Sequence, residues 1–434
     1  MAKNKIIILG AGLAGLSAAW HIQKKKKDCL IFEQENQVGG LCRSRNTNGF
    51  IFDYCGHLLH FRHRYAFRMV KGLLGRGLLE HRRSAWVYSH KRYTPYPFQA
   101  NLYGLPASVI KECLLGLMDN RRTPLKNKRY RLTFWDWINT KFGKGIARNF
   151  MVPYNEKFWT VSPRRLTCEW LDGFIPVPTL NNIIEGVVAK NRQEFGYNTR
   201  FWYPEESGIM KLPLALARGI KNIYTGCAVS GIDLHKKEIR LANGTRERFD
   251  YLISTIPLPE ANFLIKEMPD KVRKAFGRLR WNSIFNLNLG IKDKACLDRH
   301  WVYFPEKEFC FFRTGFYHNF SPNLAPGNKG SVYVEVAYSK YKPIDKKRIS
   351  RQVEAGLIKC GIISGGAEDN ICAEEANDIH YGYPIYDRHY SSARQEVLKY
   401  LISRCMLPCG RYGSWSYMSM EDAILDGRRA AEIF

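Results

Sequence analysis

Three glycines and one acid near the N-terminus have the types and spacing that bind a dinucleotide. Gly10, Gly12 and Gly15 directly follow the apolar run 5–9, and Glu33 ends a second apolar run about twenty residues further on. In such a motif the first glycine makes a tight turn, the second lets a pyrophosphate approach the backbone, and the third lets a helix pack closely on the strand. The helix N-terminus faces the phosphate charge, and the acid can bind a ribose hydroxyl. The pattern predicts a Rossmann-like domain.

A second glycine pair follows this motif. Gly39 and Gly40 come shortly after Glu33, and Arg43 and Ser44 come next. This arrangement resembles the extended fingerprint of flavin enzymes in the amine oxidase and protoporphyrinogen oxidase group, where the pair and the Arg and Ser run along the FAD diphosphate. The resemblance implies that the cofactor is FAD and not NAD.

The rest of the chain must position this motif and whatever reacts beside it. A chain of 434 residues is too long for one simple core, so we expect two or three domains. Helical patterns begin near residues 105, 133 and 180, and strand patterns occupy 222–257 and 283–340. The predicted fold class is α/β: a Rossmann-like FAD-binding domain with an inserted helical domain and an antiparallel β-sheet domain. The expected boundaries are 1–90, 200–275 and 395–434 for the discontinuous FAD-binding domain, 91–199 for the helical substrate domain, and 276–394 for the sheet.

The charge and the cysteines exclude some classes of function. A net charge of +27 suits a nucleic-acid-binding protein, but the basic residues are spread along the chain, and clusters such as 24–27 are typical of solvated turns. We therefore expect no nucleic-acid partner, but an anionic substrate and at most loose attraction to an anionic membrane surface. The twelve scattered cysteines, the lack of a bilayer-length apolar run and the lack of a signal peptide predict a cytoplasmic protein with reduced thiols.

Longer blocks carry a more specific resemblance. They include 52–57, 95–99, 153–159, 168–171, 301–305, 382–384 and 410–417. Together these blocks resemble UDP-galactopyranose mutase of the eukaryotic type, with gaps, from the N-terminus to Gly427. The resemblance implies a redox-neutral reaction in which N5 of reduced flavin attacks the anomeric carbon of a nucleotide-sugar. The sugar then opens and recloses, so that a UDP-hexopyranose and its furanose form interconvert, and NAD(P)H is the expected reductant.

The same resemblance assigns roles to residues of this chain. Negative charge builds on the leaving diphosphate, so cations are needed there, and Arg313 and Arg411 match the family's diphosphate-binding arginines. The implied catalytic residues are Arg313, Arg411, His57, Tyr383 and Tyr417. The implied nucleotide-sugar contacts are Tyr96, Phe98, Gln99, Asn155, Trp159, Arg313, Tyr383, Arg411 and Tyr417. The implied FAD contacts are Gly10, Gly12, Leu13, Ala14, Gly15, Glu33, Gly39, Gly40, Arg43, Ser44, Gly56, His57, Arg83, Val229, Gly410, Arg411, Met420 and Asp422.

Other interpretations remain open at this point. His57, His60 and His63 suggest a metal site, but no nearby acid or thiolate completes one, so we expect no metal. The main alternative function is an FAD-dependent oxidoreductase of the amine oxidase or protoporphyrinogen oxidase type. A third is a basic, membrane-associated binding protein that keeps the flavin fold without turnover.

Two positions depart from the family. Phe174 stands where the family has an arginine, and Phe320 stands where it has a tyrosine. Both differences are expected to remove polar groups from around the substrate phosphates. We expect a basic residue close in sequence, Arg164 or Arg165, to compensate for the missing arginine.

Overall fold

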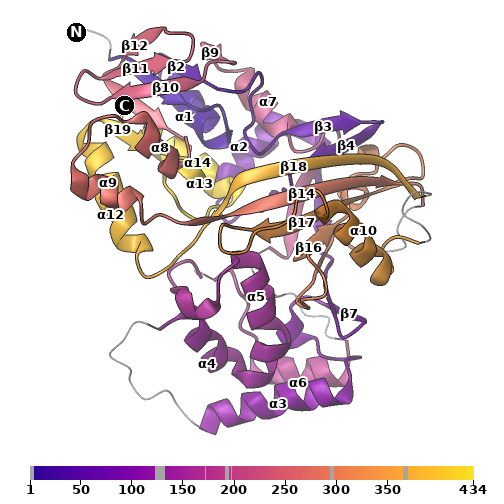
Figure 1. The fold of residues 1–434 in the computed structure, drawn as a ribbon. Coiled ribbons are helices and arrows are strands. Elements are labelled where there is room, and N and C mark those ends of the chain that lie inside the picture. The colour runs from indigo at the N-terminus through magenta and orange to yellow at the C-terminus, as the bar shows by residue number, and fades with distance from the viewer. Residues whose placement is uncertain are drawn as a thin grey trace.

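The computed structural model describes residues 4–122, 132–171, 173–190, 195–196, 198–293, 298–364 and 370–434. Three parts are visible in Figure 1: a dinucleotide-binding part that holds the C-terminus, a long curved sheet in the middle, and a group of helices at the opposite end. The chain leaves the first part and returns to it, so the fold is α/β with an inserted helical region and an antiparallel sheet. The predicted fold class is confirmed.

A parallel sheet forms the centre of the dinucleotide-binding part. The apolar strand β1 pairs with β2 on one side and β13 on the other, and the strand order is β19-β13-β1-β2-β9. Helix α1 begins at Leu13, directly after the glycine turn, and packs against α14, where Gly427 brings the two backbones close. The elements are β1 (Ile6–Leu9), α1 (Leu13–Lys24), β2 (Cys29–Phe32), β9 (Ile223–Tyr224), β13 (Tyr251–Ser254), β19 (Met406–Pro408), α13 (Gly410–Gly413) and α14 (Met420–Ala431).

Smaller elements surround this sheet. The antiparallel strands β10, β11 and β12 form the return segment predicted within 222–257, and its strand positions are confirmed. These elements are β3 (Ser44–Thr47), β4 (Phe50–Asp53), α2 (Arg64–Leu74), β5 (Leu78–Arg82), β8 (Arg200–Pro204), α7 (Lys211–Ala217), β10 (Val229–Asp233), β11 (Glu238–Leu241), β12 (Arg246–Arg248), α8 (Leu258–Leu264), α9 (Asp270–Phe276) and α12 (Tyr390–Ser403).

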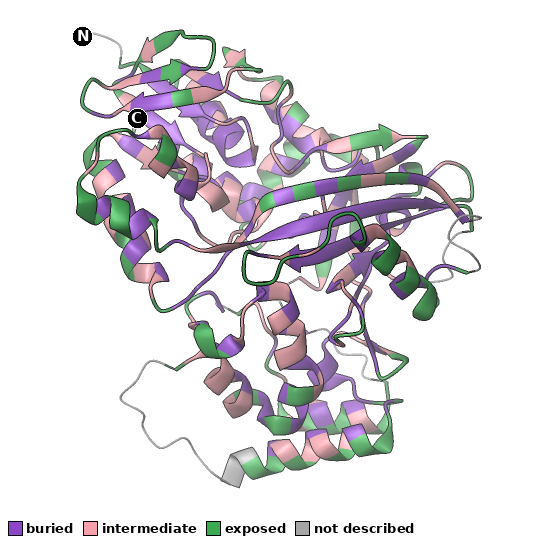
Figure 2. Cartoon of the chain, viewed as in Figure 1, coloured by how far each residue is buried: buried purple, intermediate pink, exposed green. Residues whose placement is uncertain are grey.

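The central sheet is seven-stranded, in the order β18-β14-β17-β16-β15-β6-β7. All of its neighbouring pairs are antiparallel except β15 and β6. Figure 2 shows β14 and β17 buried, whereas β18 alternates between buried and exposed residues. The elements are β6 (Ala85–Ser89), β7 (Arg92–Pro95), β14 (Trp281–Ile291), β15 (Trp301–Tyr303), β16 (Arg313–Gly315), β17 (Gly330–Tyr338), α10 (Ile349–Lys359) and β18 (Ile371–Pro384).

The helical insertion follows the predicted starts closely. Thr133 and Thr179 each form a capping box at the start of a helix, which satisfies backbone N–H groups that the helix itself leaves free. Phe134, Phe142 and Ile146 face the core together with residues of α3. The elements are α3 (Ala107–Arg122), α4 (Phe134–Ile146), a π-helical turn (Ala147–Met151), α5 (Val152–Trp159) and α6 (Leu180–Val188).

Two sequence expectations need correction. The boundary expected at residue 90 falls inside the hairpin β6–β7, which belongs to the central sheet because β6 pairs with β15. The long strand β18 lies outside the strand region expected at 283–340. It was missed because Glu374 and Asp378 interrupt its apolar pattern on the exposed face and its pairing with β14 shifts register at two places.

Candidate active site

One cavity of about 1110 Å³ runs between the three parts of the molecule. The C-terminal ends of β1 and β2 form one end, as expected for a doubly wound parallel sheet. Helix α5, strand β18 and the segment that begins at Gly410 form the other walls. Segments far apart in sequence therefore meet around a single space.

The glycine motif lines the first end of this cavity. Gly10 has φ +95°, which allows the tight turn after β1, and its N–H donates to Phe32 O at 2.8 Å. A Cβ on Gly12 would have only Gly40 Cα within 4 Å, at 3.8 Å, so it would project into open space of the cavity. A Cβ on Gly15 would lie 2.0 Å from Gly10 O. Gly12 thus leaves room for a ligand, and Gly15 permits close packing.

Acid and backbone groups at this end fit a dinucleotide. Glu33 is buried, and its carboxylate accepts from Ala11 N at 2.6 Å and from Glu35 N at 3.0 Å. Gly39 donates to Ala11 O at 2.9 Å, which holds the second glycine pair beside the first. Arg43 donates from Nε to Gly40 O at 2.8 Å and pairs with Glu35 at 3.0 Å. The open space at Gly12, the start of α1 and Glu33 together suit the diphosphate and ribose of FAD.

Most of the predicted site residues line this cavity. Those at its surface are Gly10, Gly12, Leu13, Ala14, Glu33, Gly39, Gly40, Arg43, Gly56, His57, Tyr96, Gln99, Asn155, Val229, Arg313, Tyr383, Gly410, Arg411, Tyr417 and Met420.

Four predicted cofactor contacts are not at the cavity surface: Gly15, Ser44, Arg83 and Asp422. Ser44 donates to Asp53 at 2.6 Å and accepts from Met210 N, so its hydroxyl is used in holding β3 and β4 to the next segment. Asp422 closes the capping box of α14 and pairs with Arg62 at 2.7 Å. Arg83 donates to Phe195 O at 2.7 Å, and its guanidinium carbon lies 5.2 Å from the ring centre of Tyr96. None of the four lines the cavity, so their direct contact with FAD stays a prediction.

Two predicted substrate contacts belong to the core. Trp159 and Phe98 both have no exposed surface and do not line the cavity. Trp159 packs edge-on against Trp170, and Phe98 stacks on Phe150. Both side chains instead support neighbours that do line the cavity.

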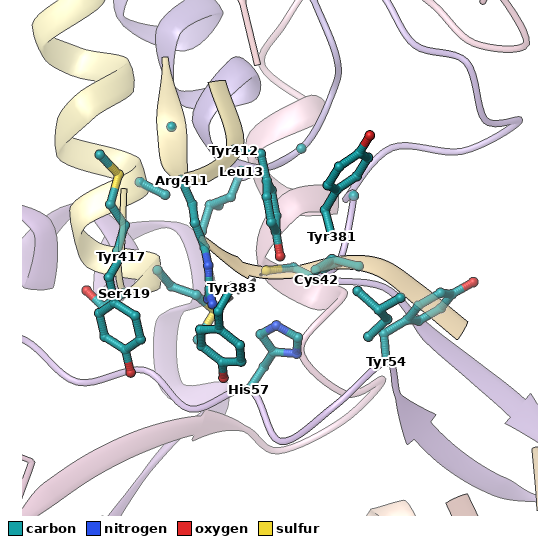
Figure 3. A pocket seen from close by; sticks show the side chains of 18 of the residues that line it. Leu13, Cys42, Tyr54, His57, Tyr381, Tyr383, Arg411, Tyr412, Tyr417 and Ser419 are labelled. Atoms are coloured by element: carbon teal, nitrogen blue, oxygen red, sulfur yellow. Dashed lines mark hydrogen bonds between the residues drawn. The ribbon is translucent and has the colours of Figure 1, made fainter. Parts of the chain in front are cut away.

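Arg411 is the central cation of the second end. Its guanidinium carbon lies 4.3 Å from the ring centre of Tyr383 and 5.5 Å from that of Tyr417, and Nη2 donates to Gly382 O at 3.2 Å. Its Nε is buried without a hydrogen-bond partner among the described residues. Figure 3 shows Arg411 extending toward Tyr383, with His57 and Tyr412 close by. The side chain is therefore held in place with donor capacity to spare.

Arg313 is held differently. It donates from Nε and Nη2 to the two carboxylate oxygens of Glu335, at 2.6 and 2.8 Å. Glu335 is 2% exposed, so the pair is buried and its charges cancel. Sequence analysis missed Glu335, although a single acid inside the apolar run of β17 was a signal that a cation lies opposite.

His57 carries no charge at neutral pH. Burial, reinforced by the positive charge of Arg411, lowers the pKa of His57 to about 4. Its Nδ1 lies 3.2 Å from Cys55 O, so the neutral ring can donate there. Among the described residues, no group of three or more His, Cys, Asp or Glu side chains could hold a metal ion.

The two departures from the family lie in different places. Phe174 lines the cavity and packs edge-on against Tyr417, with the ring centres 4.8 Å apart. Phe320 is buried beside Tyr203 and Tyr333 and does not line the cavity, so the expectation that it removes a polar group there is wrong.

The expected compensation for Phe174 is also wrong. Arg164 and Arg165 are exposed, and Arg164 lies on the ring of Trp135, 3.8 Å from its centre. Neither side chain lines the cavity. Sequence proximity failed here because the short 3-10 helix Pro163–Arg165 turns both side chains outward.

Several aromatic residues of the cavity were also missed. Tyr154 from α5, Tyr303 from β15 and Tyr412 from α13 all line it. All three stand inside sequence blocks that carry the family resemblance, which was the available signal.

Comparisons with known proteins agree with this geometry. The model of the flavin-containing amine oxidoreductase family matches residues 183–433, and the model of NAD(P)-binding Rossmann-like domains matches residues 8–73. The first match covers more than half of the chain, so the protein belongs to the flavin-containing amine oxidoreductase family. It is an FAD-binding flavoenzyme of that superfamily.

Solved structures identify more specific similarities within this superfamily. A reduced UDP-galactopyranose mutase matches with a TM-score of 0.93 and 27% identity, over 100% of this chain and 94% of that one. The predicted resemblance to that family is confirmed. A putative protoporphyrinogen oxidase from Exiguobacterium sp. 255-15 matches with a TM-score of 0.77 and 14% identity, over 100% of this chain and 99% of that one, which shows a shared fold.

Curated relatives match over short stretches. All-trans-retinol 13,14-reductase of Homo sapiens is 35% identical over 78 residues, which is 18% of this chain and 12% of that protein. A 4,4'-diapophytoene desaturase of Staphylococcus aureus is 43% identical over 49 residues, which is 11% of this chain and 10% of that protein. This chain therefore spans about an eighth or less of the length of these relatives. Separately, no helix in the described ranges has the length and apolar character needed to cross a membrane.

Proposed function

We propose that this protein is a redox-neutral FAD-dependent mutase that interconverts a UDP-hexopyranose, such as UDP-galactopyranose, and its furanose form. The observation that carries the proposal is Arg411. It is a buried cation with a free donor, flanked by Tyr383 and Tyr417, in the same cavity as the dinucleotide motif. The full-length likeness to a reduced UDP-galactopyranose mutase supports it.

The size of the cavity supports two ligands. Its volume of about 1110 Å³ exceeds the roughly 300–1,000 Å³ of an ordinary small-molecule pocket. FAD would take the end formed by Gly12 and Glu33, which leaves the end formed by Arg313, Arg411 and the tyrosines for a nucleotide-sugar. When bound and reduced, FAD supplies a nucleophile for the anomeric carbon.

The protein groups have simpler tasks. Arg411 and the hydroxyls of Tyr383 and Tyr417 can stabilise the negative charge that builds on the diphosphate as its bond to the sugar breaks. Aromatic side chains line the same end. Neutral His57 adds no competing charge beside Arg411. The chain therefore contributes binding, orientation and electrostatic stabilisation.

Gln99 can read the nucleotide base. Its Nε2 donates to Pro176 O at 2.7 Å, which fixes the amide orientation. Its Oε1 is buried without a partner among the described residues, although Gln99 lines the cavity. An N–H of the base would satisfy this acceptor, because a buried unpaired acceptor is costly.

The test is turnover of the purified FAD-loaded protein. UDP-galactopyranose and the furanose isomer should interconvert after reduction by dithionite or NAD(P)H, and the oxidised protein should be inactive. The reductant should not be consumed in proportion to product. Oxygen uptake or hydrogen peroxide release in proportion to product would instead indicate an oxidase, the alternative within the same family.

A further inference from the structure

The substrate end of the cavity is poor in net charge. We define this end by Tyr96, Tyr154, Phe174, Tyr303, Arg313, Tyr383, Arg411 and Tyr417, all of which line the cavity. Its two arginines are not equivalent. Both outer oxygens of Glu335 bind Arg313 at 2.6 and 2.8 Å, so this pair adds no net charge. Arg313 can still donate from Nη1, but the Arg313–Glu335 pair as a whole carries no net charge.

Arg411 is the only remaining cation of this end among the described residues. No carboxylate there pairs with it, and its neighbours are Tyr383, Tyr412 and Tyr417. His57, which also lines the cavity, is neutral. The nearby Lys157 does not add a second charge to the cavity, because its ammonium group is buried elsewhere and donates to Phe304 O, Glu306 O and Phe311 O.

The cavity wall beside Arg411 is apolar at the position where a second cation could lie. Phe174 packs edge-on against Tyr417 at 4.8 Å, and Trp170 and Ile175 line the cavity next to it. An aromatic edge carries only a weak partial positive charge and gives no charge-assisted hydrogen bond. A diphosphate brought to this end therefore meets one full cation.

We propose that this site recognises the phosphates of its ligand through a single net cation, Arg411, and that Phe174 is the residue that sets this limit. The inference rests on the proposed function. It assigns the substrate class as nucleotides and nucleotide-sugars that bind mainly through the base and one phosphate. The second phosphate is held by neutral donors, which are the tyrosine hydroxyls and the Arg313–Glu335 pair.

The consequence is measurable with UMP and UDP, which differ by one phosphate. In the FAD-loaded protein their dissociation constants should agree within about fivefold, because the second phosphate gains no cation. Phe174→Arg should tighten UDP binding by about tenfold and leave UMP nearly unchanged, since a hydrogen bond to a charged group contributes about that factor. Isothermal titration calorimetry gives both constants directly.

Matched variants separate local from general charge effects. Val188→Arg adds the same charge on α6, where residue 188 is 73% exposed, and should change neither constant. Phe174→Leu should keep the ratio of the wild type. Glu335→Gln provides a second way to add a net cation to this end. It removes the charge that neutralises Arg313, so it should also favour UDP over UMP.

The possible results of these titrations distinguish failure of this inference from failure of the proposed function. If wild-type protein binds UDP more than about fiftyfold tighter than UMP, a second cation is present and this inference is overturned while the proposed function stands. If neither Phe174→Arg nor Glu335→Gln changes the ratio in folded protein, the inference is overturned as well. If wild-type protein binds neither nucleotide, the proposed function and the inference fail together.

Discussion

The guanidinium carbon of Arg411 lies 4.3 Å from the ring centre of Tyr383. This contact holds the buried guanidinium against the face of the ring, because a ring face attracts cations. The backbone supports the same arrangement, since Nη2 donates to Gly382 O at 3.2 Å. A preorganised cation of this kind is suited to a ligand phosphate, because little side-chain freedom is lost on binding.

Replacement of Arg411 by methionine should weaken UDP binding by about tenfold to a hundredfold, which corresponds to roughly 1.5–3 kcal/mol. The flavin absorbance of the purified variant should remain, because the glycine motif and Glu33 lie at the other end of the cavity. Arg164→Met is the matched control, since Arg164 lies outside the cavity on Trp135. Equal affinities of Arg411→Met and wild type for UDP would place the phosphate site elsewhere.

Two glycines of the dinucleotide motif should respond differently to a side chain. Gly12 has φ −71° and space for a Cβ, so Gly12→Val should fold but lose FAD, because the new side chain occupies the place of the pyrophosphate. In Gly15→Ala the new Cβ would meet Gly10 O at 2.0 Å, so this variant should be destabilised by about 1–3 kcal/mol. Flavin absorbance and thermal unfolding measure the two effects. A folded Gly12→Val protein with full FAD content contradicts the assignment.

Local sequence signals located the dinucleotide end well. The glycine motif and the apolar strands act within a few residues, so their consequences can be read from spacing alone. The family resemblance, carried by long blocks, brought Arg313, Arg411, Tyr383 and Tyr417 to one cavity.

Long-range relationships could not be predicted in the same way. The pairing of Arg313 with Glu335 depends on β16 lying beside β17, and the hairpin β6–β7 joins the central sheet only through β15. Trp159 and Phe98 match the blocks of the resemblance but face the core, because a block does not say which side of an element a residue occupies. Arg164 does not replace the missing arginine, because its guanidinium lies on the ring of Trp135 and not in the cavity.

The amide of Gln99 gives a prediction about base recognition. Gln99→Met keeps the length of the side chain but removes the buried acceptor Oε1, so UDP affinity should fall by about fivefold, equivalent to roughly 1 kcal/mol. Inorganic pyrophosphate has no base and should bind the variant and the wild type equally. Titration calorimetry with both ligands separates the base from the phosphates. An equal loss for pyrophosphate would mean that Gln99 acts only through its bond to Pro176 O.

The last prediction concerns acid stability and His300. Its Nδ1 accepts the backbone N–H of Ser84 at 2.9 Å, at the junction of β6 and β15, and this bond requires an unprotonated Nδ1. Burial, together with the neighbouring His81, lowers the pKa of His300 to about 4. Between pH 6.5 and 4 the unfolded chain therefore binds a proton at this residue that the folded chain does not. The stabilisation is complete above pH 6.5 and is lost as the pH falls toward 4, by an amount of order 3 kcal/mol.

His300→Asn tests this prediction, because the asparagine Oδ1 can accept from Ser84 N but does not titrate. Urea unfolding at pH 7.5, 6 and 5 should show a smaller loss of stability on acidification for the variant than for the wild type. His57, whose pKa is also lowered by burial, is present in both proteins, so its contribution cancels in the comparison. Parallel pH profiles of the two proteins would show that His300 does not contribute to the acid sensitivity.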